Sequence, residues 1–308
     1  MTAPMDPSAV RRARFARLHD APLLPISGTV NGRVASATPI RRILQQREML
    51  GLLVRRDIKA RYKDSSLGLI WTLVRPLTQL VIYYVVVGQF LGAARGIPDF
   101  AIYVFAGLTI YGLFSEIVMG GVGSIVGNSG LVKKINMPRE IFPLASIGSA
   151  MFNFGIQLVV LILATVVLGV APLHADLLYA VPSILLILVY GCAFALLLSA
   201  ANVYLRDIQY LVEVAVMLLM WASPIVYAWT MVRDTVGNGP LLEVYTNNPI
   251  TLAVLGFQRA FWVSGDVASA YPPLLWLRMG IALVIGLVLV VVTHQVFRKL
   301  QGNFAQAL

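Results

Sequence analysis

The chain has 308 residues, of which 58% are hydrophobic and 12% are charged, and its mean hydropathy is +0.80. Soluble domains carry about 25% charged residues, so this composition excludes a soluble globular protein. The net charge of +10 would by itself allow nucleic acid as a partner. Cys192, the only cysteine, lies in an apolar run, which excludes a disulfide framework within the chain and favours a small buried residue.

The charged residues are clumped, and long stretches of the chain contain no Asp, Glu, Lys or Arg. Because about 20 apolar residues cross a bilayer core as a helix, these stretches predict an all-α integral membrane protein. We expect six transmembrane helices in a domain over 71–300, with Glu116 as the one acid in the middle of a span. The approximate spans are 76–94, 101–126, 144–170, 177–201, 211–230 and 277–297.

Twenty of the 24 Lys and Arg residues lie before the first span, in the second and fourth connections, or at the C-terminus. The remaining four are Arg95, Arg233, Arg259 and Arg278. Loops rich in Lys and Arg stay in the cytoplasm, so we expect both termini on the cytoplasmic side of a bacterial plasma membrane. The basic excess therefore indicates topology and contact with membrane lipids, and nucleic acid is not an expected partner.

The first 39 residues are rich in Pro, Ala, Ser and Arg and lack hydrophobic periodicity. They also lack the apolar core of a signal peptide, so we expect a mobile cytoplasmic tail over 1–39. Across 40–70, apolar residues recur every four positions and basic residues fill the rest. This pattern predicts an amphipathic helix in the headgroup plane. A cytosolic helix packed on a partner is the alternative, and the direct continuation into the first span favours the interfacial helix.

The cytoplasmic connection 128–140 is short and amphipathic, and Pro138 restricts its exit into the third span. A short, stiff helix between two spans can transmit the motion of a partner protein to both of them. A plain loop that carries cytoplasmic lysines is the alternative interpretation of this segment.

No lysine in the chain follows a glycine, so the chain lacks a P-loop and cannot hydrolyse ATP by that route. Ion-coupled carriers hold several ionisable groups at mid-membrane, and this sequence does not. His19, His174 and His294 lie in different compartments or at span ends, so neither a catalytic cluster nor a metal or cofactor site is expected. The energy for any transport must therefore come from a separate protein.

The fifth connection is long, external and half apolar. Asn248 and Pro249 are typical of a helix start, and the apolar stretch 250–263 is too short to cross the membrane. We therefore expect a re-entrant segment over 240–265 that dips into the outer leaflet. Such backbone is tolerated only where protein or a water-filled cavity surrounds it. The last residues, 301–308, are expected to form a cytoplasmic tail.

From about residue 40 to the C-terminus, five groups of residues in order resemble the type-2 ABC exporter permeases of the polysaccharide export branch. These groups are Arg56-Asp57 with Arg61-Tyr62-Lys63 and Trp71, Asn128 with Leu131–Lys134 and Pro138–Glu140, Arg206-Asp207 with Ser223-Pro224 and Tyr227, Asn248-Pro249, and Phe297–Lys299 with Phe304-Ala305. Members of this branch export O-antigen, capsule, teichoic acid or mycobacterial galactan.

The resemblance implies a permease subunit that is not itself an enzyme and that pairs with a second copy of itself. Two copies of a separate ABC ATPase, which bind ATP and Mg, would dock on the coupling segment 128–140. A polyprenyl-pyrophosphate-linked polysaccharide would enter near the interfacial helix and cross the plasma membrane between the two copies. The Arg- and Ala-rich N-terminus indicates an actinobacterial source, which adds galactan to O-antigen-like glycans as a candidate substrate.

The resemblance and the chemistry of the side chains together indicate four sets of site residues. The ATPase-coupling set is Asn128, Leu131, Lys133, Lys134, Met137, Pro138, Arg139 and Glu140. The set for the substrate headgroup, suited to charge-assisted hydrogen bonds with a pyrophosphate, is Arg55, Arg56, Lys59, Arg61, Tyr62 and Lys63. The candidate channel lining is Trp71, Tyr83, Tyr84, Tyr111, Glu116, Trp221 and Tyr227. The external gate is Asn248, Pro249 and Phe257.

Alternatives remain for these sets and for the function. The aromatic residues can form an interfacial belt or pack in the core instead of contacting sugar rings. Glu116 can line the pathway or hydrogen-bond to a neighbouring helix. A permease of the same architecture that exports a drug or a lipid is the alternative function, whereas an enzyme or ion-coupled carrier lacks the acids and histidines it needs.

Overall fold

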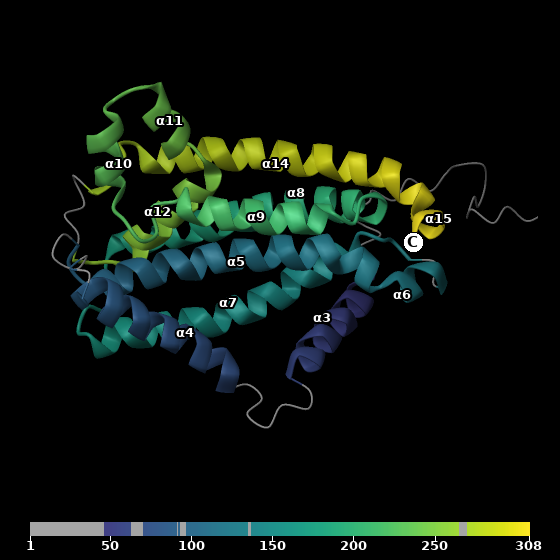
Figure 1. Cartoon of the computed structure of the whole chain (residues 1–308), viewed down its shortest axis with the longest axis horizontal. Coiled ribbons are helices and arrows are strands. Elements are labelled where there is room, and N and C mark those ends of the chain that lie inside the picture. The colour runs from purple at the N-terminus through teal and green to yellow at the C-terminus, as the bar shows by residue number, and fades with distance from the viewer. Residues whose placement is uncertain (1–45, 63–69, 91, 93–96, 135–136, 265–269) are drawn as a thin grey trace, which may run out of the picture. The chain divides into compact units, whose positions relative to one another are not determined.

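The computed structural model describes residues 46–62, 70–90, 92, 97–134, 137–264 and 270–308. All regular structure in these ranges is helical, and no strand occurs within them (Figure 1). The prediction of an all-α protein is therefore confirmed. The tail expected over 1–39, the first residues of the interfacial helix and Lys63 lie outside the described residues.

Four helical segments are long and apolar enough to cross a membrane. They are α5 (Phe100–Gly127), α7 (Ile141–Val167), η3 (Ala175–Tyr179) with α8 (Ala180–Tyr204), and α14 (Leu275–Leu300) with η4 (Gln301–Asn303). They lie in the second, third, fourth and sixth predicted spans. The first and fifth predicted spans contain shorter apolar helices, Pro76–Phe90 and Ile208–Trp221.

The first of these shorter helices is irregular. Helix α4 (Ile70–Ile82) has Pro76 in its interior and passes directly into η1 (Tyr83–Phe90), which is a π-helix. The proline lacks the amide hydrogen that an α-helix needs at this position, and π-helices are wider than α-helices and rare. The helical segment in the first predicted span therefore departs from regular α-helix in two places.

The second shorter helix, α9 (Ile208–Trp221), ends well before residue 230, where the fifth predicted span ends. Pro224 explains the difference, because it lacks an amide hydrogen and disfavours helical backbone at Ser223. The chain then forms α10 (Trp229–Val236), α11 (Pro240–Thr246) and α12 (Pro249–Phe261). In Figure 1 these three helices lie together at one end of α5 and α14.

Helix α5 is the central element and packs against α7, α8, α9 and α12. Its sequence is apolar on all sides, as expected for a helix enclosed by others. Small residues let α5 and α8 approach closely: a Cβ on Gly121 would lie 2.5 Å from the Cβ of Ala195. A Cβ on Gly191 of α8 would likewise lie 2.8 Å from Ile117. Close contact through small residues is typical of helix pairs in membranes.

The buried apolar side chains form two clusters. The larger one joins α5, α7, α8, α12 and α14. The smaller one joins α3 (Arg47–Tyr62), α6 (Ser129–Lys134) and α15 (Phe304–Ala307) to the adjacent ends of α5, α7, α8 and α14. Figure 1 shows α6 and α15 at the opposite end of α5 and α14 from α10–α12. The predicted interfacial helix, the coupling segment and the C-terminus thus meet in one core.

Candidate functional site

Asn128 connects the end of α5 to the start of α6. Its side-chain amide donates to the carbonyl of Ser124 at 2.7 Å, and its backbone carbonyl accepts from the amides of Leu131 and Val132 at 2.9 and 3.0 Å. These bonds satisfy backbone groups at both helix ends, which otherwise lack partners. Asn128 therefore helps to set the angle between α5 and α6.

Helix α6 turns one side inward and the other outward. Val132 is buried in the smaller cluster, whereas Lys133 and Lys134 at the end of the helix are exposed. Two cations in the last turn of a helix are favourable next to its partially negative end. The arrangement leaves a basic, accessible edge on a short helix whose apolar side is held by the rest of the chain.

Helix α3 packs on this region through apolar and polar contacts. Leu53 is buried in the smaller cluster. Val54 lies against Gly148 of α7, where a Cβ added to the glycine would be 2.7 Å from Cγ2 of Val54. The Arg56 guanidinium donates to Oδ1 of Asn128 at 2.8 Å and to Asp57 at 2.7 Å. Helix α3 is thus hydrogen-bonded to the start of the segment 128–140.

The predicted headgroup residues divide into two groups in the structure. Arg55 and Lys59 are exposed, with no partner side chain among the described contacts. Arg56 binds Asn128, and Nη1 of Arg61 lies 3.9 Å from the carboxylate of Glu116. Nothing is described of the Tyr62 side chain, and Lys63 lies outside the described residues.

Glu116 accepts a hydrogen bond from a neighbouring helix. Nδ2 of Asn153, on α7, donates to its Oε2 at 2.8 Å, and Arg61 approaches the same oxygen from α3. A carboxylate inside a span is costly unless it is paired or hydrated, and these two partners meet that requirement. Glu116 is therefore hydrogen-bonded to α7, and about a third of its side chain stays exposed.

The C-terminal half of the coupling segment contacts the end of the chain. Met137, Pro138 and Arg139 are half-buried, and Glu140 is 5% exposed. The Arg139 guanidinium lies 5.7 Å from the ring centroid of Phe304. Residues 301–308, expected to be a tail, instead form η4 and α15 and pack on this segment. Sequence reasoning missed this contact, although a large apolar residue such as Phe304 in a polar terminus is a signal of packing.

The predicted external gate consists of a helix start and a core residue. Oδ1 of Asn248 accepts from the amide of Ile250 at 3.0 Å, and Pro249 occupies the first turn of α12, as preferred at helix N-termini. The predicted helix start is therefore confirmed. Phe257 is fully buried, with its ring 4.8 Å from that of Phe261 and 6.0 Å from that of Phe154.

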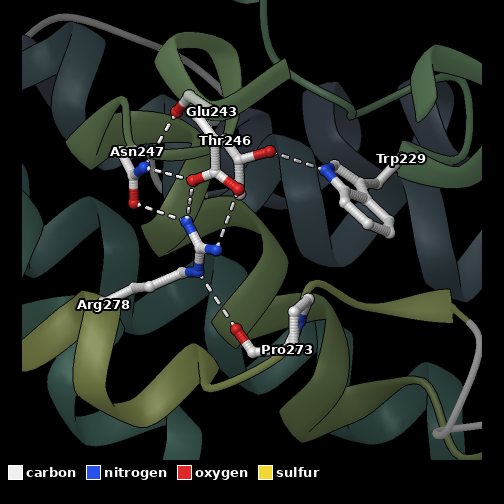
Figure 2. A network of polar contacts seen from close by, with 6 residues as sticks. All are labelled: Trp229, Glu243, Thr246, Asn247, Pro273 and Arg278. Atoms are coloured by element: carbon white, nitrogen blue, oxygen red, sulfur yellow. Dashed lines mark hydrogen bonds and ion pairs between the residues drawn. The ribbon is translucent and has the colours of Figure 1, made fainter. Parts of the chain in front are cut away.

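An arginine on α14 holds α11 through several bonds (Figure 2). The Arg278 guanidinium donates to Glu243 at 2.6 and 3.1 Å, to Oδ1 of Asn247 at 2.9 Å and to the carbonyl of Pro273 at 3.0 Å. The hydrogen bond from Arg278 lowers the pKa of Glu243 below its ordinary value of 4.5. The paired arginine and carboxylate thus tie α11 to the start of α14, a contact that the sequence did not indicate.

A second arginine ties α12 to the start of α8. Nη2 of Arg259 lies 3.2 Å from Asp176, and its guanidinium stacks 4.3 Å from the ring centroid of Tyr179. Partly buried cation–π and ion-pair contacts of this kind are stronger than exposed ones. Together with Arg278, this contact means that two of the four arginines predicted to be external hold helices that lie between α9 and α14 in the chain.

The candidate channel residues differ in exposure. Tyr111 is buried, and its hydroxyl donates to the carbonyl of Val216. Tyr227 donates to the carbonyl of Trp221 at 2.7 Å. By contrast, the side chains of Tyr84 and Trp221 are 49% and 59% exposed. The remaining two give less information, because Tyr83 is half-buried and nothing is described of the Trp71 side chain.

The chain matches the family model of the ABC-2 type transporter over residues 48–262, and it belongs to that family. It is 25% identical over 262 residues to the O-antigen export system permease protein RfbA of Klebsiella pneumoniae, which covers 85% of this chain and 95% of the relative. A protein of the same name from Myxococcus xanthus is 28% identical over 223 residues, or 72% of this chain and 84% of the relative.

These relatives confirm the resemblance drawn from the sequence motifs. Membership of the family, together with several long apolar helices, makes the chain a multi-pass membrane protein. Permease subunits of this family are transmembrane components that work with an ABC ATPase, and they are not in general enzymes themselves.

Proposed function

We propose that this chain is the permease subunit of an ATP-driven exporter that moves a polyprenyl-pyrophosphate-linked polysaccharide from the cytoplasm across the plasma membrane. The glycan is an O-antigen-like polymer or galactan. Two copies of the chain form the pathway, and two copies of an ABC ATPase supply the energy. The short helix α6, with a buried apolar side and the exposed Lys133 and Lys134, is the observation that supports this function most directly.

The proposed topology has six spans with both termini in the cytoplasm. Segments α4–η1 and α9 form the first and fifth spans beside the four long ones. The end that carries α3, α6 and α15 faces the cytoplasm, because the loops rich in Lys and Arg lie there. Helices α10–α12 then lie on the external side and form the outer end of the pathway.

Substrate recognition begins at α3. Arg55 and Lys59 are exposed on this helix, where a pyrophosphate in the headgroup plane would receive charge-assisted hydrogen bonds. The exposed aromatic side chains of Tyr84 and Trp221 offer flat faces to sugar rings farther along the pathway. These four residues are therefore the first candidates for contact with the lipid-linked glycan.

Charge reversal tests the docking of the ATPase. Replacing Lys133 and Lys134 with Glu should lower the amount of co-purified ATPase about tenfold or more, because charge complementarity governs encounter and register at interfaces. The matched control replaces Arg298 and Lys299, an exposed basic pair at the end of α14. Equal co-purification from both double variants would contradict docking on α6.

Transport itself is tested in proteoliposomes that contain the purified permease and its ATPase. A lipid-linked glycan should become resistant to an external glycosidase only when ATP is present and both proteins are reconstituted. Translocation by the permease alone would refute the proposal. Export of a drug or a simple lipid without export of the glycan would refute the substrate and favour the alternative permease function.

A further inference from the structure

The last residues of the chain are anchored to two of its long helices. Phe304 is fully buried, with its ring centroid 5.6 Å from that of Phe297 on α14 and 6.0 Å from that of Tyr204 on α8. The Tyr204 hydroxyl also donates to the carbonyl of Leu300 at 2.7 Å. A terminal segment stays ordered only when such contacts hold it, and here the contacts join α8, α14 and α15.

The same terminal segment contacts the coupling segment where it enters α7. The Arg139 guanidinium faces the Phe304 ring at 5.7 Å. Glu140 is 5% exposed, and Nε2 of Gln301 donates to its Oε1 at 3.4 Å. Nε2 of His294 lies 3.6 Å from the same oxygen, which is within ion-pair range when the imidazole is protonated. A buried carboxylate needs partners of this kind, and Gln301 and His294 both come from the end of the chain.

The coupling segment therefore has a support on each side of α6. Asn128 precedes α6 and binds Arg56 of α3, whereas Arg139 and Glu140 follow α6 and bind the C-terminal segment. Lys133 and Lys134 lie between the two supports and are exposed. A force applied to α6 therefore acts on the segment 128–140, and the end of this segment, at Arg139 and Glu140, packs against residues of α14, η4 and α15.

We propose that Phe304, Gln301 and His294 are positioning residues for the coupling segment, so that motion of α6 is carried into α8 and α14 as well as into α5 and α7. This inference rests on the proposed function, since it assumes that an ATPase acts on α6. The C-terminal segment is then a working part of the transmission. Without Phe304, Arg139 and the start of α7 lose an apolar contact with the C-terminal segment. Motion of α6 then bends the chain locally and is not passed on to α8 and α14.

The first test uses the permease alone and so does not depend on transport. Amide hydrogen exchange is measured in peptides that cover Ser129–Lys134 and the start of α7. Phe304→Ala should speed exchange there about tenfold or more, because a large cavity in the core promotes local opening. The matched control is Gln306→Ala, since Gln306 is exposed on the same short helix. In this control the same peptides should exchange as slowly as in the original chain.

Phe304→Leu keeps an apolar side chain in the core but removes the aromatic ring that Arg139 faces. Phe304→Leu should restore most of the protection from hydrogen exchange that Phe304→Ala loses. This result would identify apolar packing as the main source of that protection. Unchanged exchange in the coupling segment of Phe304→Ala would overturn the inference, whatever the protein transports. Equal acceleration in Gln306→Ala would overturn it as well.

The second test uses the complete complex of permease and ATPase in proteoliposomes. Phe304→Ala should still bind the ATPase, because the exposed edge of α6 is unchanged, but it should translocate several-fold less glycan for each ATP hydrolysed. A purely structural defect would instead reduce the amount of folded complex and leave that ratio constant. An unchanged ratio in folded complexes therefore refutes a positioning role. Absence of transport by the original complex would refute the proposed function instead, and the exchange test would still decide whether the support exists.

Discussion

Adding a single methyl group at Gly121 should separate two closely packed helices, α5 and α8. A Cβ at this position would lie 2.5 Å from the Cβ of Ala195 and 2.9 Å from its Cα, whereas real Cβ atoms stay beyond 3.0 Å. The obstacle includes backbone of α8, which cannot rotate away as a flexible side chain can. Helices α5 and α8 must therefore move apart locally in Gly121→Ala.

The expected cost follows from a comparison with Gly123, two residues farther along α5. A Cβ at Gly123 meets no atom within 4 Å. Both substitutions gain the same helix-propensity benefit, about 1 kcal/mol in water, so this benefit cancels in the comparison. Overpacking a core costs about 1–3 kcal/mol. Gly121→Ala should thus be less stable than Gly123→Ala by about 1–3 kcal/mol.

The free energy of unfolding can be measured for both variants in mixed detergent micelles, with transport activity recorded in parallel. Gly155→Ala in α7 is a second control, because a Cβ there also meets no atom within 4 Å. We expect both controls to match or exceed the original chain in stability. Equal stability of Gly121→Ala and Gly123→Ala would refute the close packing of α5 on α8.

Two further predictions concern the ion pairs. Glu116→Gln keeps an acceptor for Asn153 but loses the charge that attracts Arg61 at 3.9 Å. Because the pair is partly exposed, a double-mutant cycle with Arg61→Gln should give a coupling energy below about 1 kcal/mol. A coupling energy several times larger would contradict the exposure of the pair. Because Arg278 lowers the pKa of Glu243 below 4.5, their pairing stabilises the fold above that pH and is lost as the pH falls through the folded value. The excess in melting temperature of the original chain over Arg278→Met should therefore shrink as the pH falls below 4.5 toward the lower folded pKa of Glu243. An excess that stays constant as the pH falls below 4.5 would refute the linkage.

Local signals in the sequence predicted much of the helical architecture. Uncharged stretches of about 20 residues leave a membrane protein little choice but helix, because backbone groups in lipid must be bonded within the segment. The start of α12 was predicted for the same kind of reason, since the side chain of Asn248 caps the helix that Pro249 begins. The early end of α9 was also available from sequence, because Ser223-Pro224 disfavours continuation of the helix.

The pairings between helices could not be read in this way. Glu116 and Asn153 are 37 residues apart, Glu243 and Arg278 are 35 apart, and Glu140 and Gln301 are 161 apart. Each pair forms only because two helices adopt a particular rotation and height relative to each other. Periodicity within one helix does not contain that information.

The sequence by itself determined that this chain is helical, membrane-embedded and without its own means of hydrolysing ATP through a P-loop, because composition, span length and the absence of a motif are properties of the linear chain. Only the tertiary structure decided that residues 301–304 pack on Arg139 and Glu140 and that Glu116 is bonded to α7. Those contacts depend on how closely α5, α7, α8 and α14 pack. For α5 and α8, that closeness is set in three dimensions by where small residues such as Gly121 and Gly191 face the neighbouring helix.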